Sequence, residues 1–114
     1  MAIVSSHILD SVTGSHAAGI RCQLYILGAA EREMVFDVVA DDEGRISETV
    51  DIDSSNRGSE FELVFQGADY FNARSVGTES MVKTVVIRFT MAEDKRYHLP
   101  VMLSPHSYST WWSS

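Results

Sequence analysis

The side chains best suited to chemistry in this sequence are four histidines and one cysteine: His7, His16, Cys22, His98 and His106. Histidine changes its charge near neutral pH, so it can serve as an acid, a base or a metal ligand. The histidines show neither His-x-His nor His-x-x-x-His spacing, and one cysteine cannot supply the thiolates of a structural zinc site. We therefore expect no metal site.

His98 has the most informative position of the five. The segment 97–104 alternates as a β-strand does, with Tyr97, Leu99, Val101 and Leu103 on the core face and His98 on the other. Pro100 cannot donate to a strand ladder, which predicts that this strand lies at an edge or is irregular there. A histidine beside such a proline is well placed for chemistry or for an interface, although a lone strand histidine is more often a plain surface residue.

Other catalytic motifs are missing from the sequence. There is no Gly-x-Ser-x-Gly elbow for a nucleophilic serine, and the glycines form no phosphate-binding loop. Cys22 falls on the apolar face of its predicted strand, which indicates a packing role.

Length and charge limit the class of protein. The chain has 114 residues, with 9 Lys plus Arg against 16 Asp plus Glu and a net charge of -7. This length predicts a single domain over residues 1–114, and the acidic balance argues against nucleic acid or an anionic membrane as a partner. The unpaired cysteine and the lack of a basic, apolar leader predict a cytoplasmic protein, with the peroxisome as the alternative in a eukaryotic source.

The apolar pattern predicts an all-β protein. Apolar and polar residues alternate, as in half-buried strands, over residues 20–27, 33–39, 46–52 and 60–66. In the second of these the apolar set is Met34, Phe36 and Val38. Residues 82–91 are more continuously apolar, which predicts a central strand covered on both faces.

Turn residues separate the predicted strands, notably at Asp41–Gly44 and Ser54–Ser59. Residues 67–77 are an exception, in which Asp69 can cap a short helix and Gly77 can end it.

Three segments together resemble the transthyretin-like family. They are Ser-His-Ile-Leu-Asp at 6–10 with Ala-Ala-Gly-Ile-Arg at 17–21, Asp-Glu-Gly-Arg-Ile at 42–46, and Tyr-His-Leu-Pro-Val-Met-Leu-Ser-Pro at 97–105 followed by Tyr-Ser-Thr at 108–110. They occur in the family's order and spacing across nearly the whole chain. The resemblance implies a transthyretin-like (prealbumin) two-sheet antiparallel sandwich of about eight strands with one short helix. It also implies a homotetramer, a dimer of dimers with its sites at the dimer–dimer interface.

The family contains 5-hydroxyisourate hydrolases and a hormone carrier, and three positions distinguish them. The hydrolases have histidine, arginine and histidine where this chain has His7, Arg45 and His98, and the carrier replaces all three. The resemblance thus implies a cofactor-independent hydrolase that opens a cyclic amide of an oxidised purine in urate breakdown. By the same resemblance, His7 and His98 position and activate water while Arg45 orients the substrate and stabilises the oxyanion. It leaves open which histidine is the base.

The C-terminal tail departs from the family pattern. Hydrolases typically end in Tyr-Arg-Gly-Ser, whereas this chain ends in Trp-Trp-Ser-Ser, so that only Ser114 matches and belongs by resemblance to the catalytic set. Trp111 keeps the aromatic character of the family's tyrosine but lacks its phenolic hydroxyl. Trp112 replaces the fixed positive charge of the family's arginine with an apolar surface. We predict that Trp111 and Trp112 line the substrate pocket. Ser15-His16 replaces the usual Lys-Pro, which we interpret as a loop change with little catalytic meaning.

Two alternatives to urate breakdown follow from this tail. One is a diverged enzyme that keeps His7, Arg45 and His98 but acts on a more apolar cyclic substrate, for example in a biosynthetic pathway. The other is a non-catalytic ligand binder on the same scaffold. In each case the expected partner is a small molecule.

Overall fold

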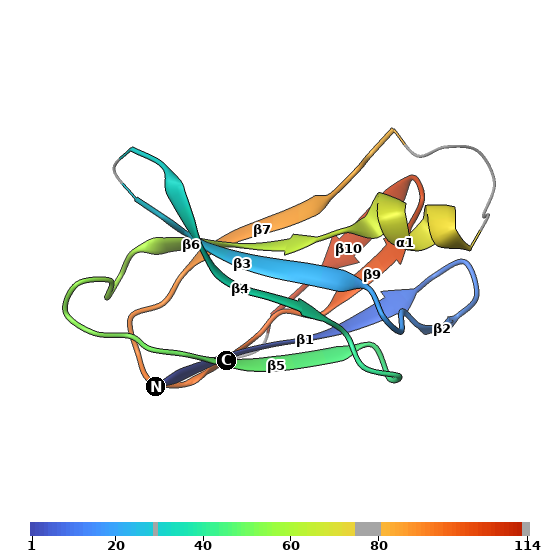
Figure 1. Cartoon of the computed structure of the whole chain (residues 1–114). Coiled ribbons are helices and arrows are strands. Elements are labelled where there is room, and N and C mark those ends of the chain that lie inside the picture. The colour runs from blue at the N-terminus through green and yellow to red at the C-terminus, as the bar shows by residue number, and fades with distance from the viewer. Residues whose placement is uncertain (29, 75–80, 113–114) are drawn as a thin grey trace.

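A computed structural model describes residues 1–28, 30–74 and 81–112 of the chain (Figure 1). The strands and the helix follow in the order β1 (Ala2–Asp10), β2 (Ser15–His16), β3 (Arg21–Leu27), β4 (Arg32–Val39), β5 (Arg45–Val50), β6 (Glu60–Phe65), α1 (Gly67–Ala73), β7 (Val85–Thr90), β8 (Arg96–His98), β9 (Val101–Ser104) and β10 (Ser107–Thr110). The two sheets and the single short helix confirm the predicted all-β sandwich. Ten strands are present in the described residues, because β2 is a two-residue strand and the segment from β8 to β9 is interrupted.

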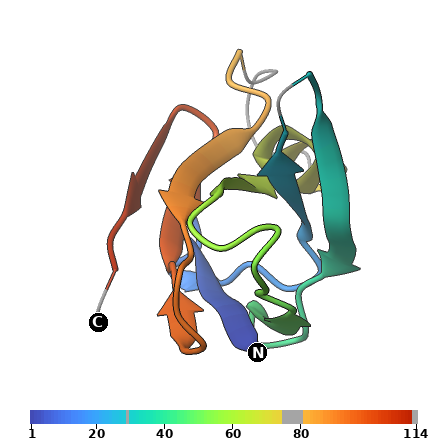
Figure 2. The same cartoon turned by 90° about the vertical axis from the view of Figure 1, so that its left-hand side faces the viewer.

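The first sheet is organised around β1. It runs β10-β9-β1-β2, and β5 and β8 also pair with β1. The second sheet runs β4-β3-β6-β7 and packs over the first, as the two layers in Figures 1 and 2 show. The sandwich departs from a purely antiparallel one, since β1 pairs in parallel with β8 and β9. The chain crosses from β7 in the second sheet to β8 in the first and then runs in the direction of β1.

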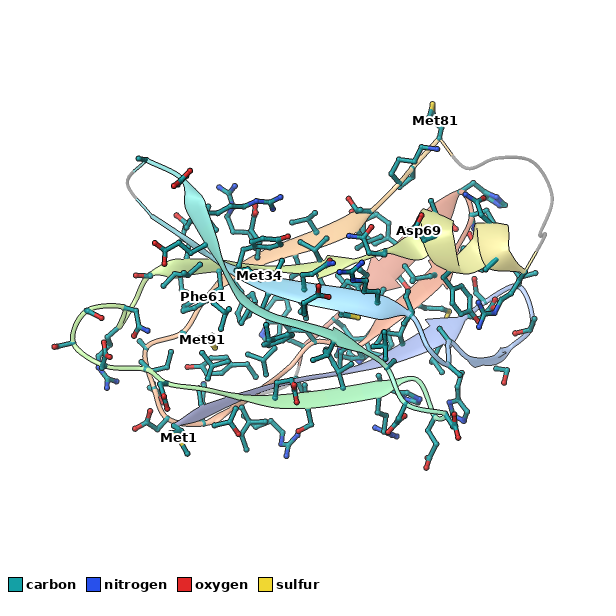
Figure 3. The ribbon with its side chains drawn as sticks, in the orientation of Figure 1. Met1, Met34, Phe61, Asp69, Met81 and Met91 are labelled. Atoms are coloured by element: carbon teal, nitrogen blue, oxygen red, sulfur yellow. The ribbon has the colours of Figure 1, made fainter. Side chains whose placement is uncertain are left out.

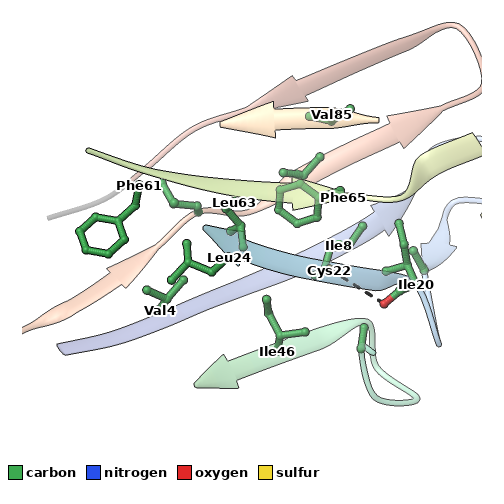
Figure 4. Packing of buried hydrophobic residues seen from close by; sticks show 14 of the residues in the cluster. Val4, Ile8, Ile20, Cys22, Leu24, Ile46, Phe61, Leu63, Phe65 and Val85 are labelled. Carbon is green, nitrogen blue, oxygen red and sulfur yellow. Dashed lines mark hydrogen bonds between the residues drawn. The ribbon is translucent and has the colours of Figure 1, made fainter. Parts of the chain in front are cut away.

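The core lies between the two layers. Alternate residues of β3 and β6 point inward, including Cys22, Leu24, Phe61, Leu63 and Phe65, all of them fully buried (Figure 4). They meet Val4, Ile8 and Ile46 from the first sheet (Figure 4). Figure 3 shows Phe61 and Met91 between the layers. The predicted alternation in these strands is therefore confirmed, and Cys22 has the packing role expected of it.

Two expectations about the second sheet are wrong. Met34 is 52% exposed, because a bulge shifts the register of β3 against β4 between Leu24 and Tyr25 and turns Met34 away from the core. The strand within residues 82–91 is not central. β7 lies at the end of its sheet, and Val86 is 43% exposed.

The predicted irregularity at Pro100 is confirmed. The strand pairing of β8 ends at His98 and resumes at Val101. Across the gap, the Leu99 N–H donates to the Ser5 carbonyl at 2.9 Å and the Ser6 hydroxyl donates to the Leu99 carbonyl at 2.6 Å. β1 thus satisfies both backbone groups of Leu99, one with a backbone carbonyl and the other with a side-chain hydroxyl.

The short helix α1 is confined to Gly67–Ala73 and packs against the core through Ala68, Tyr70 and Phe71. Asp69 lies in the first helical turn and is not the cap, because Gln66 occupies that position; Asp69 is exposed (Figure 3). Gly77, the predicted helix end, lies outside the described residues. Within the described residues no helix is long and apolar enough to cross a membrane.

The turn before β5 is built from the predicted Asp41–Gly44 segment. The Asp41 carboxylate accepts hydrogen bonds from the backbone N–H groups of Glu43 and Arg45, at 2.9 and 3.0 Å. These two bonds lower the pKa of Asp41. Gly44 has φ +71°, and its carbonyl accepts from the Ile8 N–H at 2.7 Å, which ties the turn to β1.

Substitution of Gly44 tests how tightly this turn is held. A Cβ at this position would collide with the Ile8 carbonyl oxygen, whereas a Cβ at Gly58, which has φ +81°, would meet nothing within 4 Å. We expect Gly44→Ala to lower the free energy of unfolding by about 3 kcal/mol and Gly58→Ala by about 1 kcal/mol, since only the second cost is purely conformational. Urea denaturation of both variants measures the difference, and equal losses would contradict the close packing of the turn.

Candidate active site

The outer face of the first sheet collects the polar residues singled out in the sequence. Along β1 the side chains of Val4, Ser6 and Ile8 point toward the core side, so Ser5 and His7 share the opposite face. His7 is directly opposite Arg45 of β5, and Ser5 is directly opposite His98 of β8. Three separate segments of the chain therefore bring His7, Arg45 and His98 onto one face of three adjacent strands.

His98 is held by a serine of the neighbouring strand. The Ser5 Oγ lies 2.9 Å from His98 Nδ1, and Ser5 is 3% exposed. Among the described residues, none forms a hydrogen bond with the other ring nitrogen, Nε2. The pKa of His98 is lowered by burial and then by the positive charges of Arg45 and Arg96. The ring therefore stays neutral to a lower pH than an ordinary histidine.

His7 lies in a similarly cationic environment. The pKa of His7 is lowered by burial first, then by Arg45 and by His16, while a backbone hydrogen bond at Glu43 opposes these effects. His7 Nε2 lies 3.0 Å from His16 Nδ1, with the ring centroids 5.1 Å apart. Both proposed catalytic histidines are thus biased toward the neutral form that can accept a proton.

Arg45 is positioned by the turn that precedes it. Its backbone N–H is bound by Asp41, and its side chain is exposed on the face that carries His7. Among the described residues, no carboxylate forms an ion pair with the Arg45 guanidinium. The guanidinium can therefore bind an anionic oxygen with its fixed charge and planar donors.

The C-terminal segment joins this site from one side. A cleft of about 470 Å³ lies between β7, β8 and the segment after β10, and His98, Trp111 and Trp112 are among its lining residues. The Thr110 hydroxyl donates to the Pro100 carbonyl at 2.8 Å, which fixes the segment beside β8. Figure 2 shows this segment leaving along the edge of the molecule. Trp111 is 46% exposed and Trp112 is 78% exposed.

The structure describes five of the six predicted site residues, and they fall into two groups. His7, Arg45 and His98 share a sheet face, while Trp111 and Trp112 meet only His98 of these, at the cleft. Ser114 lies outside the described residues. In the part of the chain that the structure describes, no three of His, Cys, Asp and Glu are grouped as metal ligands. Cys22 is buried, and burial raises its pKa to about 12.

Two residues of the site were not identified from the sequence. Ser5 could have been found by parity, since it lies two positions before His7 on the same strand face. We interpreted Ser15-His16 as a loop change with little catalytic meaning, and so missed the contact between His16 and His7. This contact arises because β2 folds back on the end of β1.

Comparison with known proteins gives matches over almost the whole chain. Residues 4–112 match the HIUase/Transthyretin family. A 5-hydroxyisourate hydrolase of Mesorhizobium japonicum is 37% identical over 112 residues, which cover 95% of this chain and 89% of that protein. The solved structure of Klebsiella pneumoniae 5-hydroxyisourate hydrolase is similar with a TM-score of 0.80 and 30% identity over 100% of both chains. An (S)-allantoin synthase has a TM-score of 0.80 and 25% identity over 99% of this chain, which spans 44% of that chain.

Proposed function

The chain belongs to the HIUase/transthyretin family, and from that premise we propose that it is a hydrolase that opens the cyclic amide of 5-hydroxyisourate. One observation carries the proposal: His7, Arg45 and His98 come from three separate segments and lie on one face of adjacent strands. Curated relatives from several bacteria carry the name 5-hydroxyisourate hydrolase.

His98 is the better placed of the two histidines to act as the general base. With Nδ1 donating to Ser5 Oγ, the lone pair of Nε2 is free to take a proton from water. The resulting hydroxide attacks the ring acyl carbon, and Arg45 stabilises the oxyanion that forms. The ring C–N bond then breaks, the proton on His98 passes to the ring nitrogen, and the acyl carbon becomes the carboxylic acid of the ring-opened product.

His7 has a complementary part in this proposal. It lies opposite Arg45, and its neutral ring can hold the attacking water or a substrate carbonyl between itself and the guanidinium. Ser114 stays a proposed member of the same set. No cofactor takes part, because histidine and arginine supply all the acid, base and charge that the step requires.

The proposed enzyme works as a homotetramer, a dimer of dimers. Two features support this assembly. The face that carries His7 and Arg45 is open in one chain, and a second subunit lying over it would exclude water and strengthen its electrostatics. β7 and β10 are also unpaired on one side among the described residues, so each can add a partner strand. The single domain over residues 1–114 and the cytoplasmic location also stay predictions.

A diverged substrate is the second candidate, and the tryptophan cleft favours it. Trp111 and Trp112 add uncharged aromatic surface beside His98, in a cleft that Arg88, Lys95 and Arg96 also line. Such a wall suits a more apolar cyclic substrate than an oxidised purine. A non-catalytic ligand binder would use the same cleft without needing His98 as a base.

The primary test is the decay of 5-hydroxyisourate. The compound is generated in situ by urate oxidase, and its ultraviolet absorbance is followed against the spontaneous rate. We expect the wild-type protein to accelerate the decay and His98→Ala to reduce kcat by about 10²- to 10⁴-fold, the usual contribution of a general base.

His106→Ala is the matched control, because His106 lies in the turn between β9 and β10, away from the shared face. It should retain the wild-type rate. Decay no faster than the spontaneous rate with the wild-type protein would contradict the hydrolase function. Full acceleration by His98→Ala would instead show that the family is right and the assigned base is wrong.

The tail variant Trp112→Arg tests the substrate preference. We expect kcat/KM for 5-hydroxyisourate to rise roughly tenfold, the value of one charge-assisted hydrogen bond to a polar substrate. Trp112→Ala removes the ring without adding charge and should give a smaller gain. If neither variant differs from the wild type, Trp112 has no influence on which substrate is accepted.

A further inference from the structure

His16 lies against His7 at the edge of the proposed site and has no part in the mechanism above. His7 Nε2 and His16 Nδ1 are 3.0 Å apart, and the planes of the two rings are tilted by 37°. His16 belongs to β2, which pairs with the end of β1 through Leu9 and Asp10. The two imidazoles are therefore brought together by strand pairing and not by a flexible loop.

A nitrogen–nitrogen separation of 3.0 Å leaves room for a single bridging hydrogen. One ring must donate it and the other must accept it, so the contact selects the tautomer of each ring. If both rings were protonated, two donors and two positive charges would face each other. A positive charge on His16 therefore disfavours a proton on His7.

The surroundings of the pair reinforce this restriction. Arg45 of β5 and His98 of β8 both lie on the face that His7 shares. Glu43, in the turn before β5, provides a backbone hydrogen bond and a negative charge that favour protonated His7. Asp41 of the same turn interacts electrostatically with His16. Burial, Arg45 and His16 thus disfavour a proton on His7, and Glu43 favours one.

We propose that His16 is a positioning residue for His7, whose ring it holds through Nε2 in one orientation and one neutral tautomer. The inference rests on the proposed function, because it assigns His16 a role in the same site. Through this contact His16 fixes how the His7 ring is oriented beside Arg45. It also extends the pH range over which His7 is uncharged toward lower pH.

Two variants separate the hydrogen bond from the charge. The side-chain amide of asparagine lies near the place of histidine Nδ1, so His16→Asn can keep the contact with His7 while removing the titrating ring. His16→Ala removes both. His16 is exposed on a two-residue strand, so both variants are expected to fold, and thermal unfolding checks this.

The test combines imidazole NMR titration of His7 with the pH dependence of kcat. The pKa of His7 should rise in both variants because a neighbouring positive charge is lost, and the acid limb of the kcat profile should move to higher pH with it. At pH 8, where His7 is neutral, kcat should fall about three- to tenfold in His16→Ala, the value of one hydrogen bond, and should stay within about twofold in His16→Asn.

The outcomes that overturn the proposal are equally specific. An unchanged His7 titration in both variants would show that the two rings do not interact. Equal kcat values at pH 8 for the wild type and His16→Ala would show that the contact does not position His7. The NMR titration needs no substrate, so a wild-type protein inactive on 5-hydroxyisourate would contradict the proposed function and leave the pairing of His7 with His16 to be decided by the titration.

Discussion

The hydrogen-bonded register of β1 is the constraint on which the site depends. β1 pairs with β5, β8, β9 and β2, so one strand aligns four others. Its core face is fixed by Val4 and Ile8, which are fully buried. A slip of one residue would bury His7 and expose these apolar side chains, a cost that holds the register in place. Packing of the core therefore also determines which residues meet on the outer face.

The positive charge on this face is opposite in sign to the net charge of the whole chain. The protein carries a net charge of -7, yet Arg45 and Arg96 lie beside the two histidines of the sheet face. Partial burial lowers the pKa values of both His7 and His98, Arg45 lowers both further, and Arg96 adds to the effect at His98. A site of this kind keeps its bases neutral and still offers a cation to a developing oxyanion. Trp112 adds no charge to the neighbouring cleft, which Arg88, Lys95 and Arg96 also line.

Much of this arrangement could be predicted from the sequence, for identifiable reasons. Alternation placed the apolar residues of β3 and β6 in the core, and Pro100 predicted the break before β9. The bulge that exposes Met34 and the edge position of β7 depend on pairing between strands, which local pattern does not contain. The same holds for the contact of Ser5 with His98, 93 positions apart. His16 was missed because its role depends on where β2 folds back.

We propose that the outer face of β5, β1 and β8 binds the substrate. A crystal structure of the protein with urate, a stable purine close to the proposed substrate, would reveal the binding position. We expect urate in contact with the Arg45 guanidinium and His98 Nε2, with His7 beside it. Urate bound instead in the 280 Å³ cavity between α1 and the β9–β10 turn, away from all three side chains, would contradict it.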